Sequence, residues 1–241
     1  MLKKLLFIVF IFAALVGKAQ TNTALPKNKI DENSIVRGED GMVYPYAIWK
    51  KLMSTGKYGL RSRGTNTDSG NPEYLVYELS AEQKATYFAR MAKPRISDSF
   101  KENDDFKGFK ATDMNGNKFD LREARGKVIV LNFWFINCPP CRQEIPQLNE
   151  LVAEYKNNPD VIFLAIATDE KYDLKNFLKT NPYNYNIIDG GSYLASKYGV
   201  KLYPTHAIID KNGKVKFGTV GLASNTIYWI KKSIDDSLAA N

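Results

Sequence analysis

Two long apolar runs constrain the fold of this 241-residue chain more than any other feature. Residues 127–135 read KVIVLNFWF and residues 161–167 read VIFLAIA. Runs of this kind are typical of strands buried on both faces of a parallel sheet. Each run is followed by a segment with helical spacing, at residues 139–155 and 171–179, and parallel strands need such crossover connections. We therefore predict an α/β fold with helices on both faces of a parallel sheet.

The rest of this part of the chain has shorter elements. In chain order we expect a hairpin at 109–119, a strand at 185–188, a helix at 192–198, a hairpin at 207–220 and a helix at 226–238. The first hairpin turns at Asn115-Gly116 and the second at Asn212-Gly213, and Asn-Gly is a strong signal for a tight turn between strands. The late hairpin predicts an antiparallel edge on the otherwise parallel sheet.

The first residues have the layout of a secretory signal peptide, which we assign to residues 1–19. Lys3 and Lys4 precede an apolar run at residues 5–16, and small residues surround a cleavage point before Gln20. The apolar run is shorter than the roughly 20 residues that a spanning helix needs. We expect an exported, periplasmic protein, with an uncleaved membrane anchor as the alternative. No cysteine lies near the cleavage point, so a lipid anchor on cysteine is not expected.

Three further segments follow the signal peptide. Residues 20–93 form an N-terminal region without a recognisable role, and residues 94–104 are charged and turn-prone, which predicts a linker. Residues 105–241 carry the complete α/β pattern, so we expect them to fold on their own. Within the N-terminal region we expect a small α+β arrangement, with a helix at 47–53, a polar stretch at 62–72, a strand at 73–79 and a helix starting at a capping signal at 80–83.

The charge of the chain argues against nucleic-acid binding. The formal net charge of +8 falls to +5 without residues 1–19, because Lys3, Lys4 and Lys18 leave with them and no acid does. Spread over the remaining chain this is a mild excess, with no dense basic cluster interleaved with aromatic residues.

The two cysteines stand close together in the motif Cys138-Pro139-Pro140-Cys141. A disulfide between them would close a loop too short to constrain the unfolded chain much, so a structural bridge is the weaker interpretation. Cys138 lies at the N-cap of the helix expected from Pro139, where unpaired N–H groups and the helix dipole favour a thiolate. We therefore assign Cys138 as the attacking thiol and Cys141 as the resolving thiol. Because Pro140 has no N–H, only the Cys141 N–H can reach the Cys138 sulfur, which favours a reductant over a strong oxidant.

The motif and its surroundings resemble the thioredoxin family. The resemblance covers residues 132–141, Pro146 in the following helix and Tyr203-Pro204-Thr205 before the late hairpin, and it extends over about residues 105–241. Within that family the chain is most similar to the exported TlpA/ResA-like group, which has Asn rather than Asp on the strand and an acid three residues past the second cysteine. The resemblance implies a thioredoxin-like fold and thiol–disulfide oxidoreductase activity.

The resemblance also implies roles for individual residues and partners. Pro204 is expected to be a cis-proline facing the cysteines, and Trp134 to pack under the active-site helix with a minor role beside them. The expected substrate-binding residues are Trp134, Pro139, Pro140, Tyr203 and Thr205. Expected partners are disulfide-containing or thiol proteins and a membrane thiol electron donor, with no cofactor beyond the Cys138–Cys141 disulfide and no metal.

Glu144 has two possible roles on the sequence. Asn132 replaces the titratable Asp of thioredoxin, and Glu144 lies one turn beyond Cys141, where ResA-like proteins place an acid. It is therefore either the proton partner of the active-site pair or a residue that only complements the helix dipole.

Two other function classes remain as alternatives. His206 is the only histidine, and two cysteines with a distal histidine form the ligand set of copper-delivery proteins on this fold, although those use CxxxC. A copper chaperone or binding module, with the N-terminal region recruiting a partner, is the first alternative. A thiol peroxidase is the second, but it would need a single peroxidatic cysteine in a Thr-rich loop.

Overall fold

The structure is a computed structural model that describes residues 30–240. The predicted signal peptide at residues 1–19 and the start of the N-terminal region lie outside the described residues. Within residues 30–240, no helix combines the length and apolar character needed to cross a membrane.

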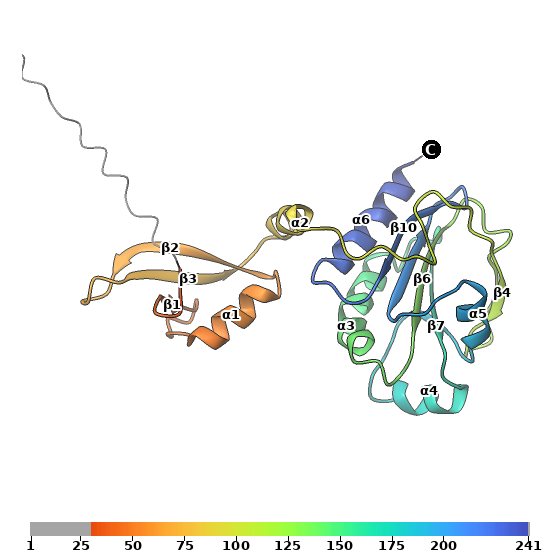
Figure 1. Ribbon diagram of the computed structural model, residues 1–241, viewed down its shortest axis with the longest axis horizontal. Coiled ribbons are helices and arrows are strands. Elements are labelled where there is room, and N and C mark those ends of the chain that lie inside the picture. The colour runs from red at the N-terminus through yellow and green to blue at the C-terminus, as the bar shows by residue number, and fades with distance from the viewer. Residues whose placement is uncertain (1–29, 241) are drawn as a thin grey trace, which may run out of the picture.

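A five-stranded sheet forms the centre of the C-terminal part, as predicted (Figure 1). Its strand order is β10-β9-β6-β7-β8, in which β6, β7 and β8 run parallel while β9 and β10 form the antiparallel edge. The strands are β6 (Val128–Trp134), β7 (Val161–Ala167), β8 (Asn186–Ile188), β9 (Thr205–Ile209) and β10 (Val215–Val220). All seven residues of β6 are buried, which explains its apolar sequence.

Helices and short strands cover the two faces of this sheet. The helices α3 (Pro139–Glu154), α4 (Lys171–Leu178) and α6 (Thr226–Ala239) contribute side chains to the core on one face. The helix α5 (Ser192–Lys197) and the residues around β4 (Lys110–Thr112) and β5 (Lys118–Asp120) enclose the core on the other face. This is the thioredoxin-like arrangement that the sequence predicted.

The N-terminal part has its own small sheet. Its elements are β1 (Ile35–Arg37), α1 (Tyr46–Ser54), β2 (Tyr58–Asn66) and β3 (Pro72–Glu78), with the strand order β1-β3-β2. Val36, Trp49, Tyr74 and Val76 form its core. Strand β2 was not expected, because its second half has a polar sequence and exposed side chains. It forms because its backbone pairs antiparallel with β3, a contact that side-chain periodicity does not report.

Helix α2 (Ala81–Arg90) lies between the two parts in Figure 1. It begins with the expected capping box, in which Ser80 and Gln83 satisfy each other's backbone N–H groups. Phe88 of α2 packs on Tyr228 of α6, with ring centroids 6.1 Å apart. On its other side Phe88 closes over Gly56, where an added Cβ would come within 2.5 Å of the phenyl ring.

Residues 94–104 are not the free linker that their composition suggested. They follow the edge of β10, where the Ser97 N–H donates to the Gly218 carbonyl (3.1 Å) and the Val220 N–H donates to the Arg95 carbonyl (3.0 Å). Phe100 anchors the segment, because its side chain is only 2 % exposed and belongs to the core under the sheet. The expected domain boundary at residue 105 therefore cuts through a packed core.

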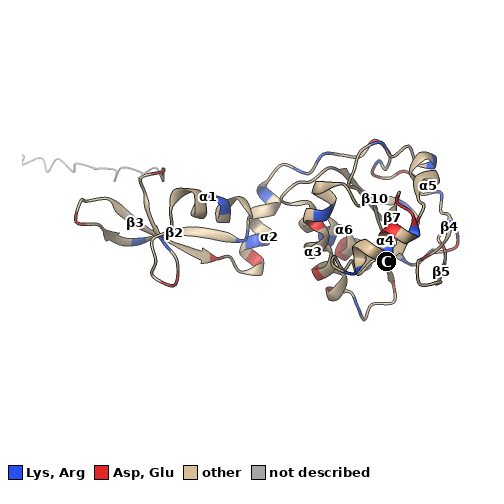
Figure 2. Cartoon of the chain, turned by 90° about the horizontal axis from the view of Figure 1, so that it is seen from below, with Lys and Arg blue, Asp and Glu red and all other residues tan. Residues whose placement is uncertain are grey.

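Charged residues of both signs are interspersed over the described part of the chain (Figure 2). Several basic side chains pair with acids, as Lys127 does with Asp160 at 2.7 Å and Lys214 with Asp105 at 2.7 Å.

Candidate active site

Cys138 and Cys141 form a disulfide at the start of α3. Their sulfurs are 2.01 Å apart and their Cα atoms 5.3 Å apart. Cys138 is the N-cap residue, and its Sγ accepts a hydrogen bond from the Cys141 N–H at 3.3 Å. This is the donor that remains when Pro139 and Pro140 occupy the first two helical positions. Both cysteines are buried in this disulfide state, Cys141 completely and Cys138 with 2 % exposed.

The turn that carries Cys138 is held at the carboxyl edge of the parallel strands. The Ile136 N–H donates to the Asp169 carboxylate at 2.8 Å, and the Thr168 N–H donates to the Trp134 carbonyl at 3.2 Å. These contacts tie the segment after β6 to the segment after β7. The segment before Cys138 is therefore hydrogen-bonded to the edge of the sheet.

The loop before β9 lies beside this turn. The Tyr203–Pro204 peptide bond is cis, as expected. Thr205 opens β9 and pairs with Phe133 of β6, which brings the loop to the end of the strand that leads to Cys138. Tyr203 also packs edge-on against Phe135, with ring centroids 5.2 Å apart. Half-burial raises the pKa of the Tyr203 phenol, so it is a neutral group at this surface.

The structure sorts the expected substrate-binding residues into two groups. Pro139 is exposed, and Pro140 and Tyr203 are half-buried, so these three can touch a partner protein. Trp134 is fully buried and packs edge-on against Tyr183, and its side chain cannot contact a partner from that position. The side chain of Thr205 is also buried and its hydroxyl donates to the Leu202 carbonyl at 2.7 Å. The expected packing of Trp134 in the core is therefore confirmed, and neither side chain is open to a partner in this state. Substrate binding through the backbone of the cis-proline loop stays a prediction.

Glu144 has a partner that the sequence analysis missed. Its Oε1 atom lies 2.8 Å from Nε2 of His206, and both side chains are fully buried. Glu144 comes from the buried side of α3, three residues past Cys141, and His206 comes from β9. The carboxyl is thus held by a specific buried partner, and the choice between proton partner and helix-dipole residue stays a prediction. The available signal was a lone histidine directly before the apolar residues of the expected strand.

Further polar side chains line the same buried region. Asn132 is the register partner of His206 in the neighbouring strand, and its Nδ2 donates to the Tyr183 hydroxyl at 2.7 Å. Burial raises the pKa of Tyr183 and of Tyr185 well above that of an exposed tyrosine, and the charge of Glu144 raises both further. Both phenols therefore stay neutral, and neither can act as a base near neutral pH.

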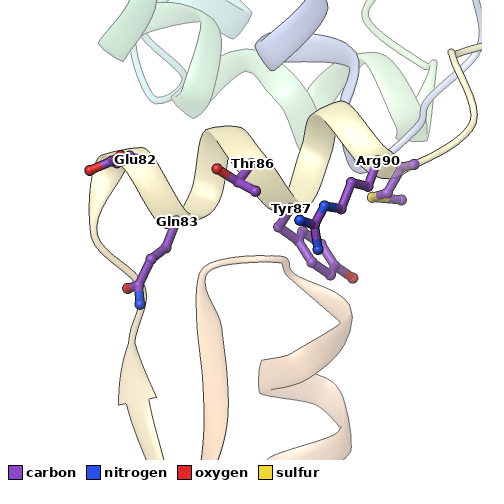
Figure 3. Close-up of a pocket in the computed structure, with 6 residues that line it drawn as sticks. Glu82, Gln83, Thr86, Tyr87 and Arg90 are labelled. Atoms are coloured by element: carbon purple, nitrogen blue, oxygen red, sulfur yellow. The ribbon is translucent and has the colours of Figure 1, made fainter.

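Elsewhere in residues 30–240, we considered metal-binding clusters and surface hollows as further candidate sites. Within residues 30–240, no group of three or more His, Cys, Asp or Glu side chains could hold a metal ion. A shallow hollow lies along α2, and Figure 3 shows that its labelled residues all come from this one helix. Its lining residues are Glu82, Gln83, Thr86, Tyr87, Arg90 and Met91.

A disulfide at a helix N-terminus, a cis-proline beside it and a buried acid below it on this sheet define a thioredoxin-like dithiol–disulfide protein. Residues 103–217 match the AhpC/TSA family model. The chain is 37 % identical over 114 residues to the Thiol-disulfide oxidoreductase ResA of Bacillus cereus, and 32 % identical over 121 residues to that of Halalkalibacterium halodurans. These alignments cover 47 % and 49 % of this chain and 66 % and 69 % of the relatives. The chain belongs to this family of ResA-like thiol–disulfide oxidoreductases.

A solved structure supports the same assignment. The thiol:disulfide interchange protein DsbE from Chlorobium tepidum is 29 % identical, with a TM-score of 0.53. The match covers 58 % of this chain and 99 % of that protein. The first curated relatives are matched over only 62 % to 66 % of their own length.

Proposed function

We propose that this protein is an exported thiol–disulfide oxidoreductase that reduces disulfides in other proteins through Cys138 and Cys141. The observation that carries the proposal is the disulfide at the N-terminus of α3, beside the cis-proline loop. The names of the relatives support the reaction class. Export is proposed from residues 1–19, and a membrane thiol protein is the proposed source of electrons.

The reaction has two exchange steps. In the first, the Cys138 thiolate attacks a substrate disulfide, so a Cys138–substrate bond forms while the substrate bond breaks and one substrate sulfur leaves as a thiolate. In the second, Cys141 loses its proton and attacks Cys138, so the Cys138–Cys141 bond forms and the second substrate sulfur leaves. The substrate gains two electrons and two protons, and the protein ends as the disulfide seen here. The thiol donor then reduces that disulfide by the reverse chemistry.

The partner surface proposed for these steps is the exposed rim around Cys138. Pro139 next to Cys138 is exposed, and Tyr203 in the cis-proline loop is half-buried, while the disulfide itself is buried. Because Cys138 is almost fully covered, a substrate sulfur must approach along this rim. The fully buried Cys141 is shielded from direct attack, which supports its role as the resolving thiol.

The direction of electron flow is proposed from the Cys138 environment. Its sulfur accepts one backbone N–H, from Cys141, because the two prolines supply none. A modestly stabilised thiolate places the thiol pKa nearer the roughly 7 of thioredoxin than the roughly 3.5 of DsbA. The reduction potential should then lie nearer about −270 mV than about −120 mV, so the protein acts as a reductant.

The test combines insulin reduction with a redox titration of the cysteine pair in glutathione or dithiothreitol buffers. We expect the wild type to reduce insulin, Cys138→Ser to be inactive and Cys141→Ser to accumulate mixed disulfides with partners. A parallel copper titration examines the chaperone alternative, and a peroxide assay examines the peroxidase alternative. Absence of insulin reduction together with tight copper binding, or with rapid peroxide turnover, would refute the proposal.

A further inference from the structure

The buried pair of Glu144 and His206 connects the active-site helix α3 to strand β9 of the sheet. Glu144 is on the same buried side of α3 as Cys141 and three residues from it, and His206 enters from β9. The Oε1–Nε2 distance of 2.8 Å is that of a strong hydrogen bond. Burying a carboxyl and an imidazole costs free energy, and pairing them often only offsets this cost. Packing alone therefore does not explain why the core holds these two residues.

The unpartnered atoms of the pair indicate its hydrogen-bonding pattern. Among the described residues, Nδ1 of His206 has no hydrogen-bond partner and is buried. An imidazolium would need acceptors for two N–H groups, and leaving a charged N–H unpaired in the core costs more than leaving a lone pair. The geometry therefore favours a neutral His206 whose Nε2–H donates to Oε1 of Glu144.

The other carboxylate oxygen is free to take a proton. Oε2 of Glu144 is buried and has no partner within residues 30–240, while Oε1 is engaged by His206. The titratable groups around the pair are Cys141 on α3 and Tyr183 and Tyr185 beside β8. Burial keeps both phenols neutral, so neither competes with the carboxylate for the thiol proton. Asn132, from β6, does not titrate.

We propose that His206 is a positioning residue that holds Glu144 by Oε1, so that Oε2 accepts the proton of the Cys141 thiol during resolution. This inference rests on the proposed function. As the proton moves to Oε2, the Cys141 sulfur bonds to Cys138 and the substrate sulfur leaves with the electron pair of the old bond. When a thiol donor next reduces the disulfide, Cys141 leaves as a thiolate and Glu144 returns the proton.

A matched pair of substitutions separates this role from simple packing. Both His206→Gln and His206→Asn place a neutral amide in the core, but only glutamine has the length to donate to Glu144 as Nε2 does. The reduced full-length protein is mixed with excess dithionitrobenzoate in a stopped-flow instrument over the carboxyl and thiol pH range. The first release of coloured thiolate reports attack by Cys138, and the second reports resolution by Cys141. This readout needs no protein substrate, so it stands even if insulin reduction fails.

We expect His206→Asn to slow the second release about tenfold, less than the roughly 10²–10⁴-fold that a general base itself contributes, because the carboxyl remains but is no longer held. His206→Gln should stay within about threefold of wild type and keep its pH profile, since the proposed histidine is a neutral donor. The first release should be unchanged in both variants. Adding His206→Asn to a Glu144→Gln protein should give no further slowing, because the positioned base is already lost.

Three results would overturn the inference. One is a His206→Asn protein that resolves at the wild-type rate throughout the pH range. Another is an equal slowing of both releases, or further slowing in the Glu144→Gln background, which would mark a packing role. If His206→Asn does not fold, the His206→Gln protein decides alone: an altered pH profile would mean that the imidazole itself titrates, contrary to the neutral donor proposed.

Discussion

Replacing Phe100 with alanine should destabilise the thioredoxin-like part severely. The side chain is 2 % exposed, and its ring lies 5.7 Å from that of Phe133 and 5.4 Å from that of Tyr198. Its backbone lies so close to β10 that a Cβ added at Gly218 would be 2.0 Å from the Phe100 carbonyl oxygen. The segment therefore cannot slide inward to fill the space left by the ring.

The expected loss follows from this rigidity. Truncating a buried phenylalanine that leaves an uncollapsed cavity costs about 3–5 kcal/mol. That is a large share of the roughly 5–15 kcal/mol that stabilises a native protein, and it corresponds to a fall in Tm of about 6–20 °C for a chain of this size.

Urea unfolding followed by tryptophan fluorescence measures this loss. Phe106→Ala is the matched control, because Phe106 is also an aromatic residue near the same segment and stacks on Tyr198 at 5.7 Å, but is half-buried. We expect Phe106→Ala to cost clearly less than Phe100→Ala. A Phe100→Ala loss of under about 1 kcal/mol, close to the level of surface substitutions, would show that residues 94–104 do not belong to the core.

Three further predictions follow from the same structure. A chain of residues 94–241 should melt cooperatively, whereas residues 105–241, which lack Phe100, should be less stable; equal midpoints in thermal unfolding would contradict this. Glu144→Gln should slow resolution by Cys141 by about 10- to 100-fold, the low side of general-base catalysis, while attack on the substrate is little changed; superimposable stopped-flow profiles from pH 5 to 9 would exclude the carboxyl as the base. Hydrogen bonds from Thr65 and then from Arg37 lower the pKa of the Glu73 carboxyl in the folded state, so its stabilisation is complete above the unfolded pKa of about 4.3 and disappears as the pH falls through the lowered value. Urea midpoints of Glu73→Gln should accordingly lie below wild type at pH 7 and converge with it in acid, and a gap that persists in acid would contradict the assignment.

Local sequence patterns predicted the thioredoxin-like part closely. The run at residues 161–167 is β7 (Val161–Ala167), and the expected strand 127–135 contains β6 (Val128–Trp134). Helix α3 (Pro139–Glu154) begins at the predicted proline with Cys138 as its N-cap. These features depend on the periodicity of neighbouring residues and on which residues lack an N–H, and both can be read without knowing the fold.

Strand β2 and the segment at residues 94–104 could not be predicted in the same way. Both are held mainly by backbone hydrogen bonds to another strand, to β3 and to β10 respectively. Backbone groups are the same in every residue except proline, so a polar sequence carries little sign of such pairing. The burial of Phe100 distinguishes residues 94–104 from a linker. Whether Phe100 is buried depends on the position of β10 in the folded protein.

The sequence by itself determined that Cys138 and Cys141 come within bonding distance at a helix start, because this arrangement depends on residues three positions apart and on the start of one helix. It also placed Glu144 on the correct side of that helix. Only the tertiary structure decided that Glu144 meets His206, 62 positions further along the chain. A helix has several neighbours on a sheet, and which side chains meet there is set by strand order and packing, which no local pattern encodes.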